Sequence, residues 1–474
     1  MQRLMVNNIT IMTRPFTISL FFICLSTATL GYAQNRRNLK QLDTLLAKAY
    51  DLGVFKGNLL VAEKGKIIYQ KTIGWTDATE QTRLTADYRL HIGSIAKEFN
   101  AVAIMILKEQ GKLSLDDHVA KYLPELPGWA ERIKIRNLLQ YTSGVPQSVW
   151  RNTKGDADNL NNLKVVTTLD FEPGTKYAYN NNDVFLQRRI IERISGMSYE
   201  SFVQEKMFIP CGITHAVFNP GETVELVAKS YNDQKKQDNM TYEIAGWPAL
   251  NLLEFYKWSE VLNSFRLISP AATRELCIAF SGDNQTGLGH GTMEGNKLVK
   301  HSHDGTAKNY QALLTSDAAK GITVILMTNN KQNNLGTINR SVFSILAGKP
   351  YANLKRSFIN DFQAQFENLT GQQTIALYNQ TKSDFSDKYA FAEEGTLNEV
   401  GYYFLNKKKV ADAISVFTLN TRLFPNSGNM YDSLGEAYYV QGDKSKALEN
   451  YVIALKLDPT LDSAKKMVAE LKKI

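Results

Sequence analysis

Residues 94–110 form a segment that is apolar on nearly every side when it is drawn as a helix. Its apolar residues include Phe99, Val102, Ala103, Met105, Ile106 and Leu107. A helix of this kind is stable only when other elements cover it on all sides, in the middle of a domain. The chain has 474 residues, which is long enough for such a core, and we expect two domains.

Candidate β-hairpins lie before and after this helix. The first spans 57–75 around a turn at 63–65, and the second joins apolar runs at 310–315 and 322–328. A closing helix is expected at 335–346. Strands at both ends of one region predict a single antiparallel sheet. The helical block between them favours an α+β fold with segregated helices over alternating βαβ units.

The C-terminal segment repeats with a period of 34 residues. The matched pairs are Gly401 and Gly435, Ala413 and Ala447, Phe417 and Tyr451, and Pro425 and Pro459. This period predicts tetratricopeptide repeats at 394–427 and 428–461, with a capping helix at 461–474. Residues 351–393 are expected to form a helical linker or a degenerate repeat. An arbitrary helical hairpin is the alternative, which four matched pairs disfavour.

Residues 1–33 have the pattern of a secretory signal peptide, with an apolar stretch at 16–30 and a cleavage site after Ala33. A membrane anchor is one alternative, but 15 residues interrupted by hydroxyl side chains are short for a bilayer span. A lipoprotein modified at Cys24 is a weaker alternative. We expect the mature chain to be periplasmic or extracellular.

The charge and cysteine content bear on possible partners. The formal net charge is +8, and it falls to +6 without residues 1–33. The sequence has no basic run with interleaved aromatic residues, so we expect no nucleic-acid partner. Cys211 and Cys277 form a disulfide or remain separate thiols, and neither has the neighbours of a metal site. We expect no metal and no cofactor.

Ser94 and Lys97 begin the buried helix and form a candidate catalytic pair. Residues three apart share a helical face, with Cβ atoms about 5–6 Å apart, so the lysine can reach the serine. A serine hydroxyl needs a base, and burial lowers the pKa of a lysine until its neutral amine is accessible. The helix N-terminus would also offer N–H groups to an oxyanion. A capping serine with a solvent-facing lysine is the structural alternative.

A second motif occupies residues 171–181. A Pro-Gly turn precedes Tyr179 and Asn181, whose spacing lets a phenol and an amide point the same way from an extended loop. A phenolate near a lysine ammonium would serve as a proton shuttle. The alternative is a structural tyrosine with a turn-forming asparagine.

A third motif occupies residues 303–306, just before an expected strand. Gly305 indicates a close approach by backbone or ligand, and the N–H of Thr306 is a candidate oxyanion donor. Strand alternation places His303 and Gly305 on one face and Asp304 on the other. Asp304 is therefore expected to be an exposed or structural carboxylate.

Residues 38–350 resemble the beta-lactamase-related serine hydrolases, a family that includes class C beta-lactamases, D-alanyl-D-alanine carboxypeptidases, D-aminopeptidases and esterases. The resemblance rests on the motifs at 93–97, 111–117, 121–125, 138–144, 171–181 and 303–306. It implies an antiparallel sheet flanked by helices beside an all-helical cluster, and it implies no metal.

The resemblance also implies a role for each motif residue. Ser94 would be the nucleophile, with Lys97 and Tyr179 as the general acid/base pair. Asn181 would hold the substrate amide. The backbone N–H groups of Ser94 and Thr306 would form the oxyanion hole.

The chain departs from the family pattern at three places. Residues 303–305 read His-Asp-Gly where many beta-lactamases have Lys-Thr-Gly, and a neutral imidazole holds a substrate carboxylate less well than an ammonium. We still expect His303, Gly305 and Thr306 to bind substrate. Tyr141 and Asn180 replace a histidine and a serine, and should affect loop packing. The histidines expected to be structural or on the surface are His91, His118, His215, His290 and His301.

These features predict acyl transfer through a covalent acyl-Ser94 intermediate, acting on a small ester or a D-amino-acid amide or peptide. Peptidoglycan DD-peptidase or beta-lactamase activity is the enzymatic alternative. A scaffold whose hydrolase domain is catalytically weak is the alternative from another class. In that case the repeats would bind a protein partner through a concave groove.

Overall fold

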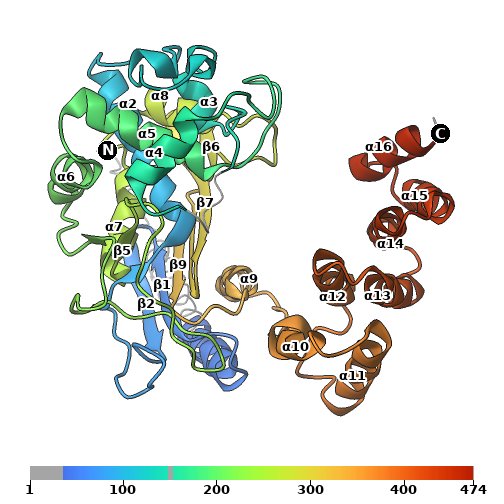
Figure 1. The fold of residues 1–474 in the computed structure, drawn as a ribbon. Helices are drawn as coiled ribbons and strands as arrows, with labels where there is room; N and C mark the ends of the chain where they lie inside the picture. The colour runs from blue at the N-terminus through green and yellow to red at the C-terminus, as the bar shows by residue number, and fades with distance from the viewer. Residues whose placement is uncertain (1–35, 148–152, 473–474) are drawn as a thin grey trace, which may run out of the picture.

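The computed structural model describes residues 36–147 and 153–472. Its main sheet has six antiparallel strands in the order β2-β1-β9-β8-β7-β6 (Figure 1). These strands are β1 (Gly57–Glu63), β2 (Lys66–Ile73), β6 (His290–Glu294), β7 (Lys297–Ala307), β8 (Tyr310–Asp317) and β9 (Ile322–Thr328). Both expected hairpins and the single sheet are confirmed. The expected signal peptide, residues 1–33, lies outside the described residues.

Strands β1 and β9 join the two ends of this domain. They pair antiparallel, with Gly57 opposite Thr328 and Leu60 opposite Ile325. A Cβ on Gly57 would lie 2.0 Å from the carbonyl oxygen of Met327, so only glycine fits at this position of the β1–β9 pair. The pairing closes one α+β domain from segments that are far apart in the sequence.

The sheet buries both of its faces. Leu60 points into a large core under the helical cluster, whereas Leu59 and Leu326 point into a smaller core on the opposite face. Alternate side chains of a strand face opposite sides, so a strand that is covered twice is apolar throughout. The helical residues 36–51 and helix α9 (Leu335–Leu346) cover the smaller core (Figure 1).

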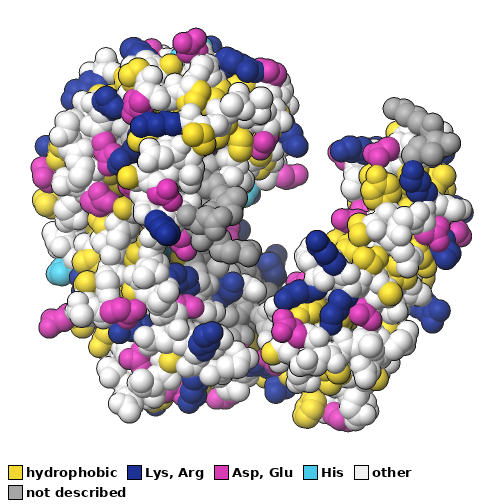
Figure 2. All heavy atoms as spheres, viewed as in Figure 1, with side chains coloured by type: hydrophobic (Ala, Val, Ile, Leu, Met, Phe, Trp, Pro, Cys, Tyr) yellow, Lys and Arg dark blue, Asp and Glu magenta, His cyan; other side chains and the backbone are white. Residues whose placement is uncertain are grey.

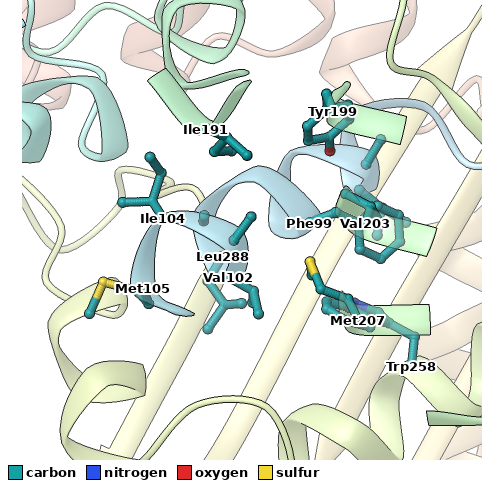
Figure 3. Close-up of a cluster of buried hydrophobic side chains, with 14 of the residues drawn as sticks. Phe99, Val102, Ile104, Met105, Ile191, Tyr199, Val203, Met207, Trp258 and Leu288 are labelled. Carbon is teal, nitrogen blue, oxygen red and sulfur yellow. The ribbon is translucent and has the colours of Figure 1, made fainter. Parts of the chain in front are cut away.

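The helical cluster surrounds α2 (Lys97–Glu109), whose residues 97–107 are all buried, as predicted. Figure 3 shows Phe99, Val102 and Met105 of α2 among apolar side chains of neighbouring elements. The other helices of this region are α3 (Ile135–Leu139), α4 (Asp156–Lys164), α5 (Asn181–Ser195), α6 (Tyr199–Val203), α7 (Leu252–Asn263) and α8 (Pro270–Leu276). Short helical turns are η1 (Gly93–Ala96), η2 (Val119–Lys121), η3 (Gly128–Glu131), η5 (Gln204–Phe208) and η6 (Ile209–Cys211). A small sheet has the order β3 (Leu90–His91), β5 (Pro248–Leu250), β4 (Val217–Phe218).

A C-terminal arm of helices follows α9 (Figure 1). Its helices are α10 (Phe358–Phe366), α11 (Gly371–Asp384), α12 (Glu394–Asn406), α13 (Val410–Leu423), α14 (Gly428–Gln441), α15 (Lys444–Leu457) and α16 (Asp462–Leu471). A Cβ on Gly401 would lie 2.3 Å from the ring of Phe417, and one on Gly435 would lie 3.1 Å from the ring of Tyr451. These tight helix pairs are compatible with the predicted repeats, and the tetratricopeptide assignment stays a prediction.

Arg356 connects the arm to the larger domain. Its guanidinium donates to the backbone oxygen of Leu52 at 2.6 Å and pairs with Asp233 at 3.0 Å. It also forms an ion pair with Asp361 of α10. One arginine therefore links α10 to two segments of the larger domain.

The arm carries exposed apolar side chains, and Figure 2 shows apolar atoms on its visible face over α14 and α15. The large exposed ones on these two helices are Tyr439, Val440, Val452 and Leu457.

No helix within residues 36–147 and 153–472 has both the length and the apolar character needed to cross a membrane.

Candidate active site

Ser94 and Lys97 lie where the helical cluster meets the sheet. The turn η1, residues 93–96, is a 3₁₀ helix, and the α-helix begins only at Lys97. The tighter turn still brings the lysine Nζ to 2.9 Å from the serine Oγ, as the spacing predicts. The Lys97 side chain does not face solvent, because the residue is only 2% exposed. Burial lowers the pKa of Lys97 to about 7, so its neutral amine is available near neutral pH.

This pKa gives a direct prediction for the pH dependence of acylation. Only the neutral amine of Lys97 can accept the Ser94 proton, so the acylation rate should rise about tenfold between pH 6 and pH 8. Stopped-flow measurement of p-nitrophenol release from an ester would test it. His91 faces the same cavity but does not titrate in this range, because burial and then the charges of Lys308 and Lys97 lower its pKa to about 3. A flat profile would rule out Lys97 as the base.

Tyr179 lies close to this pair. The Lys97 Nζ is 5.0 Å from the centre of the Tyr179 ring. Burial raises the pKa of Tyr179 above its ordinary value, and a hydrogen bond with Ser94 offsets this only in part. The resting tyrosine is therefore a neutral phenol, and the expected phenolate beside a lysine ammonium is corrected: Lys97 is the group with an accessible basic form. The physical reason is that both groups are buried, which favours the neutral form of each.

Asn181 lines the same cavity as Tyr179. It is the first residue of α5 rather than part of an extended loop, because the Asn180 side chain caps the helix by accepting from the N–H of Asn182. The buried Asn181 Oδ1 accepts no hydrogen bond from the described residues. A buried acceptor without a partner is uncommon in folded proteins, so Asn181 stays a candidate for a substrate contact.

Strand β7 approaches η1 so closely that neither side has room for a side chain. A Cβ on Gly305 would lie 2.0 Å from the Ile92 oxygen and 2.7 Å from the Ser94 nitrogen. A Cβ on Gly93, which has φ +58°, would lie 2.3 Å from the Thr306 nitrogen. The backbone nitrogens of Ser94 and Thr306 are thus brought to one end of the cavity. Two backbone N–H groups so close to each other at a cavity are candidates for an oxyanion hole.

The structure does not bring His303 to the cavity. Its side chain is fully buried, and its Nδ1 lies 2.8 Å from Glu98 Oε1 inside the domain. The expected alternation is correct, since Gly305 is buried on the same side and Asp304 is exposed. The substrate contact proposed for His303 is corrected, because the face that it shares with Gly305 is turned toward the core and away from the cavity. Thr306, on the other face, lines the cavity.

The cavity has a volume of about 360 Å³. Its lining residues are His91, Gly93, Ser94, Lys97, Tyr179, Asn181, Asn239, Met240, Tyr242, Glu243, Ile244, Trp247, Thr306, Ala307, Lys308 and Tyr310. His91 stacks on Tyr242 and Tyr310, at ring separations of 5.6 and 5.9 Å. The expectation that His91 is only structural or on the surface is wrong, because its ring forms part of the cavity wall. Nothing in the local sequence marks it, because the wall forms from segments far apart in the chain.

Lys308 is the second cation in the lining. It lies at the turn between β7 and β8, and its Nζ donates to the backbone and side-chain oxygens of Asn239 and, at 2.8 Å, to the Thr241 oxygen. These three acceptors hold the segment around Asn239 against the cavity. The ammonium is therefore already satisfied by the protein.

Tyr141 packs against Tyr179. Its ring centre lies 4.8 Å from that of Tyr179, and it adopts φ +55°. This contact agrees with the expected role in packing. Cys211 and Cys277 are both free thiols, which settles the open question of a disulfide. Residues 36–147 and 153–472 hold no group of three or more His, Cys, Asp or Glu that could bind a metal ion.

The antiparallel sheet, the helical cluster on its face and the Ser–Lys pair at their junction are the arrangement of the beta-lactamase-like serine hydrolases. The chain belongs to the Beta-lactamase family, whose model matches residues 37–347. This family includes penicillin-binding proteins, beta-lactamases and esterases.

Individual relatives agree with this assignment. A penicillin-binding protein of Bacillus subtilis is 34% identical over 39% of the chain, although the match spans only 43% of that relative. The putative penicillin-binding protein PbpX of Bacillus subtilis is 26% identical, with 62% of this chain and 75% of PbpX covered. Among solved structures, a class C beta-lactamase superposes with a TM-score of 0.56 at 18% identity, covering 67% of this chain and 97% of that one. EstCE1, described as a hydrolase with promiscuous acyltransferase activity, superposes with a TM-score of 0.55 at 19% identity, covering 66% and 99%. At these identities the two structures show the fold alone.

Proposed function

We propose that the protein is an exported serine hydrolase that cleaves a small ester or a D-amino-acid amide through an acyl-enzyme on Ser94. The observation that carries the proposal is the 2.9 Å separation between Lys97 Nζ and Ser94 Oγ. This pair lies in a cavity that Tyr179 and Thr306 also line. A nucleophile, a base with a lowered pKa and two oxyanion donors are the minimum set for acyl transfer.

The chemistry proceeds in two steps. The Ser94 Oγ attacks the substrate carbonyl carbon while its proton passes to the neutral Lys97 amine, and the N–H groups of Ser94 and Thr306 stabilise the oxyanion. The tetrahedral intermediate collapses when the leaving group takes up a proton through Lys97 and Tyr179. Water then attacks the acyl-Ser94 ester, with the same groups removing its proton, and the acid is released.

The polar groups of the cavity favour substrates without a carboxylate beside the scissile bond. Among the described lining residues the lysines are Lys97, which is the proposed base, and Lys308, whose ammonium already donates to three oxygens of the protein. His303, at the position of the lysine in many relatives, bonds to Glu98 instead. Aromatic side chains such as Tyr242 and Trp247 supply an apolar wall. A neutral ester or amide fits this lining better than a peptide with a terminal carboxylate.

A substrate panel tests this preference. A substrate carboxylate that leaves water without gaining a charged partner costs about 1.5–3 kcal/mol, whereas a neutral ester has no such cost. We therefore expect kcat/KM for nitrocefin and for a D-Ala-D-Ala peptide to be about 10- to 100-fold below that for p-nitrophenyl butyrate. Initial rates on the purified full-length chain give the comparison. A preference for the carboxylate-bearing substrates would instead support the DD-peptidase or beta-lactamase alternative.

We also propose the organisation that the sequence predicts around this domain. A signal peptide at 1–33 would precede the hydrolase domain at 38–350, followed by a helical linker at 351–393 and tetratricopeptide repeats at 394–474. The apolar residues exposed on α14 and α15, such as Val440 and Val452, support a protein-binding role for the arm. This role would add to the hydrolase activity rather than replace it.

A further inference from the structure

Glu98 follows Lys97 in α2, but its side chain is not among those that line the cavity. It has no solvent exposure, and three ring nitrogens converge on its carboxylate. His301 Nε2 lies 2.9 Å and His303 Nδ1 lies 2.8 Å from Oε1, while Trp258 Nε1 donates to Oε2 at 2.7 Å. This cluster lies outside the catalytic groups described above.

Trp258 belongs to α7, and the other two partners of Glu98 come from the strand that carries Thr306, one of the two proposed oxyanion donors. His301 and His303 both belong to β7, directly before Gly305 and Thr306. The other oxyanion donor, the Ser94 N–H, belongs to η1, which leads into α2. A single carboxylate on α2 therefore holds β7 against the start of its own helix.

The chemistry of the cluster makes this link strong. Burial by itself would raise the pKa of Glu98, but attraction to His301 and hydrogen bonds from His301 and His303 hold the pKa below its ordinary value. The group is thus a carboxylate, and each imidazole presents an N–H to it. The second ring nitrogens, His301 Nδ1 and His303 Nε2, have no hydrogen-bond partner among the described residues. A buried carboxylate that lost these donors would be costly, so strand and helix are held together.

On the basis of the proposed function, we propose that Glu98 is a positioning residue that sets the spacing of the oxyanion hole. By binding His301 and His303 of β7, it fixes the distance between the Thr306 N–H and the Ser94 N–H. Oxyanion donors must be placed within about 0.5 Å to stabilise a transition state. The close contact of Gly305 with Ile92 and Ser94 limits how near β7 can come to η1. The hydrogen bonds to Glu98 keep β7 from moving away from η1.

Glu98→Met tests the proposal, because methionine keeps the length of the side chain and removes all three acceptor contacts. We expect kcat for p-nitrophenyl butyrate to fall about 100-fold with KM changed less than threefold, since a misplacement of about 1 Å costs that much. Affinity for phenylboronic acid, whose adduct with Ser94 places an oxygen in the oxyanion hole, should fall in parallel. The matched control is Glu254→Met, because Glu254 is also a buried carboxylate, on α7, that accepts from residues 214–215. This control should keep the wild-type kcat.

A second pair of variants covers the case in which Glu98→Met does not fold. The amide nitrogen of asparagine occupies nearly the place of a histidine Nδ1, so His303→Asn should keep most of the activity, whereas His303→Leu should behave like Glu98→Met. Wild-type kcat in folded Glu98→Met or in His303→Leu would overturn the inference. Equal losses in His303→Asn and His303→Leu would also overturn it. Absence of ester hydrolysis by the wild-type protein would refute the proposed function instead, so the two failures are distinguishable.

Discussion

Replacing Ser94 with alanine should abolish covalent labelling by a fluorophosphonate or penicillin probe and lower ester hydrolysis at least about 1,000-fold. The change removes the hydroxyl that the proposed mechanism acylates and leaves Lys97, which now lacks its 2.9 Å partner, in place. Folding should be preserved, because one half-buried hydroxyl is lost from a turn held by backbone contacts. Gel fluorescence after labelling, together with initial rates, gives the answer.

Ser264→Ala is the matched control for this experiment. Ser264 is exposed after α7, and its hydroxyl donates to the Glu260 backbone oxygen. Labelling and rates of this variant should equal those of the wild type. Probe that still attaches to the Ser94→Ala protein with wild-type stoichiometry would refute Ser94 as the nucleophile.

Gly305→Ala should lower both the stability of the protein and its kcat. The added Cβ would lie 2.0 Å from the Ile92 oxygen and 2.7 Å from the Ser94 nitrogen, so β7 must move away from η1. Overpacking of this kind costs about 1–3 kcal/mol of stability. The movement also separates the N–H groups of Ser94 and Thr306, which should lower kcat about 100- to 1,000-fold. Thermal unfolding and steady-state kinetics measure the two effects separately.

A glycine in open space provides the comparison. Gly128 begins η3, and a Cβ there would meet no atom within 4 Å, so Gly128→Ala should leave both Tm and kcat unchanged. If Gly305→Ala retains wild-type kcat, the backbone of β7 does not form part of the oxyanion hole.

Much of the fold follows from local patterns. The turn at 63–65 and the apolar runs on either side of 317–321 predict hairpins, because turn residues and strand alternation act over a few neighbours. The helix after Ser94 is recognisable as buried because it has no polar face. Glu98, like Lys97, is a charged residue in the buried part of this helix, and such a residue indicates a buried partner of opposite charge or a hydrogen-bond donor.

Local contacts in the candidate site were predictable from the sequence, but the face of β7 that borders the cavity was not. The Ser94–Lys97 contact follows from a spacing of three, which the 3₁₀ turn preserves. The alternation of His303 and Asp304 was also correct. Which face of β7 meets the cavity was not predictable, since that depends on η1 packing over Gly305 from a segment more than two hundred residues earlier.

By itself the sequence determined the hairpins, the buried helix, the reach of Lys97 to Ser94 and the period of the C-terminal helices, all of which depend on neighbours within one element or one repeat. Only the tertiary structure decided that His91 and Trp247 form a cavity wall, that Lys97 is desolvated enough for its pKa to reach about 7, and that Glu98 binds β7. Burial and dielectric environment are properties of the packed whole. Side chains from distant segments create them together, so no local pattern encodes them.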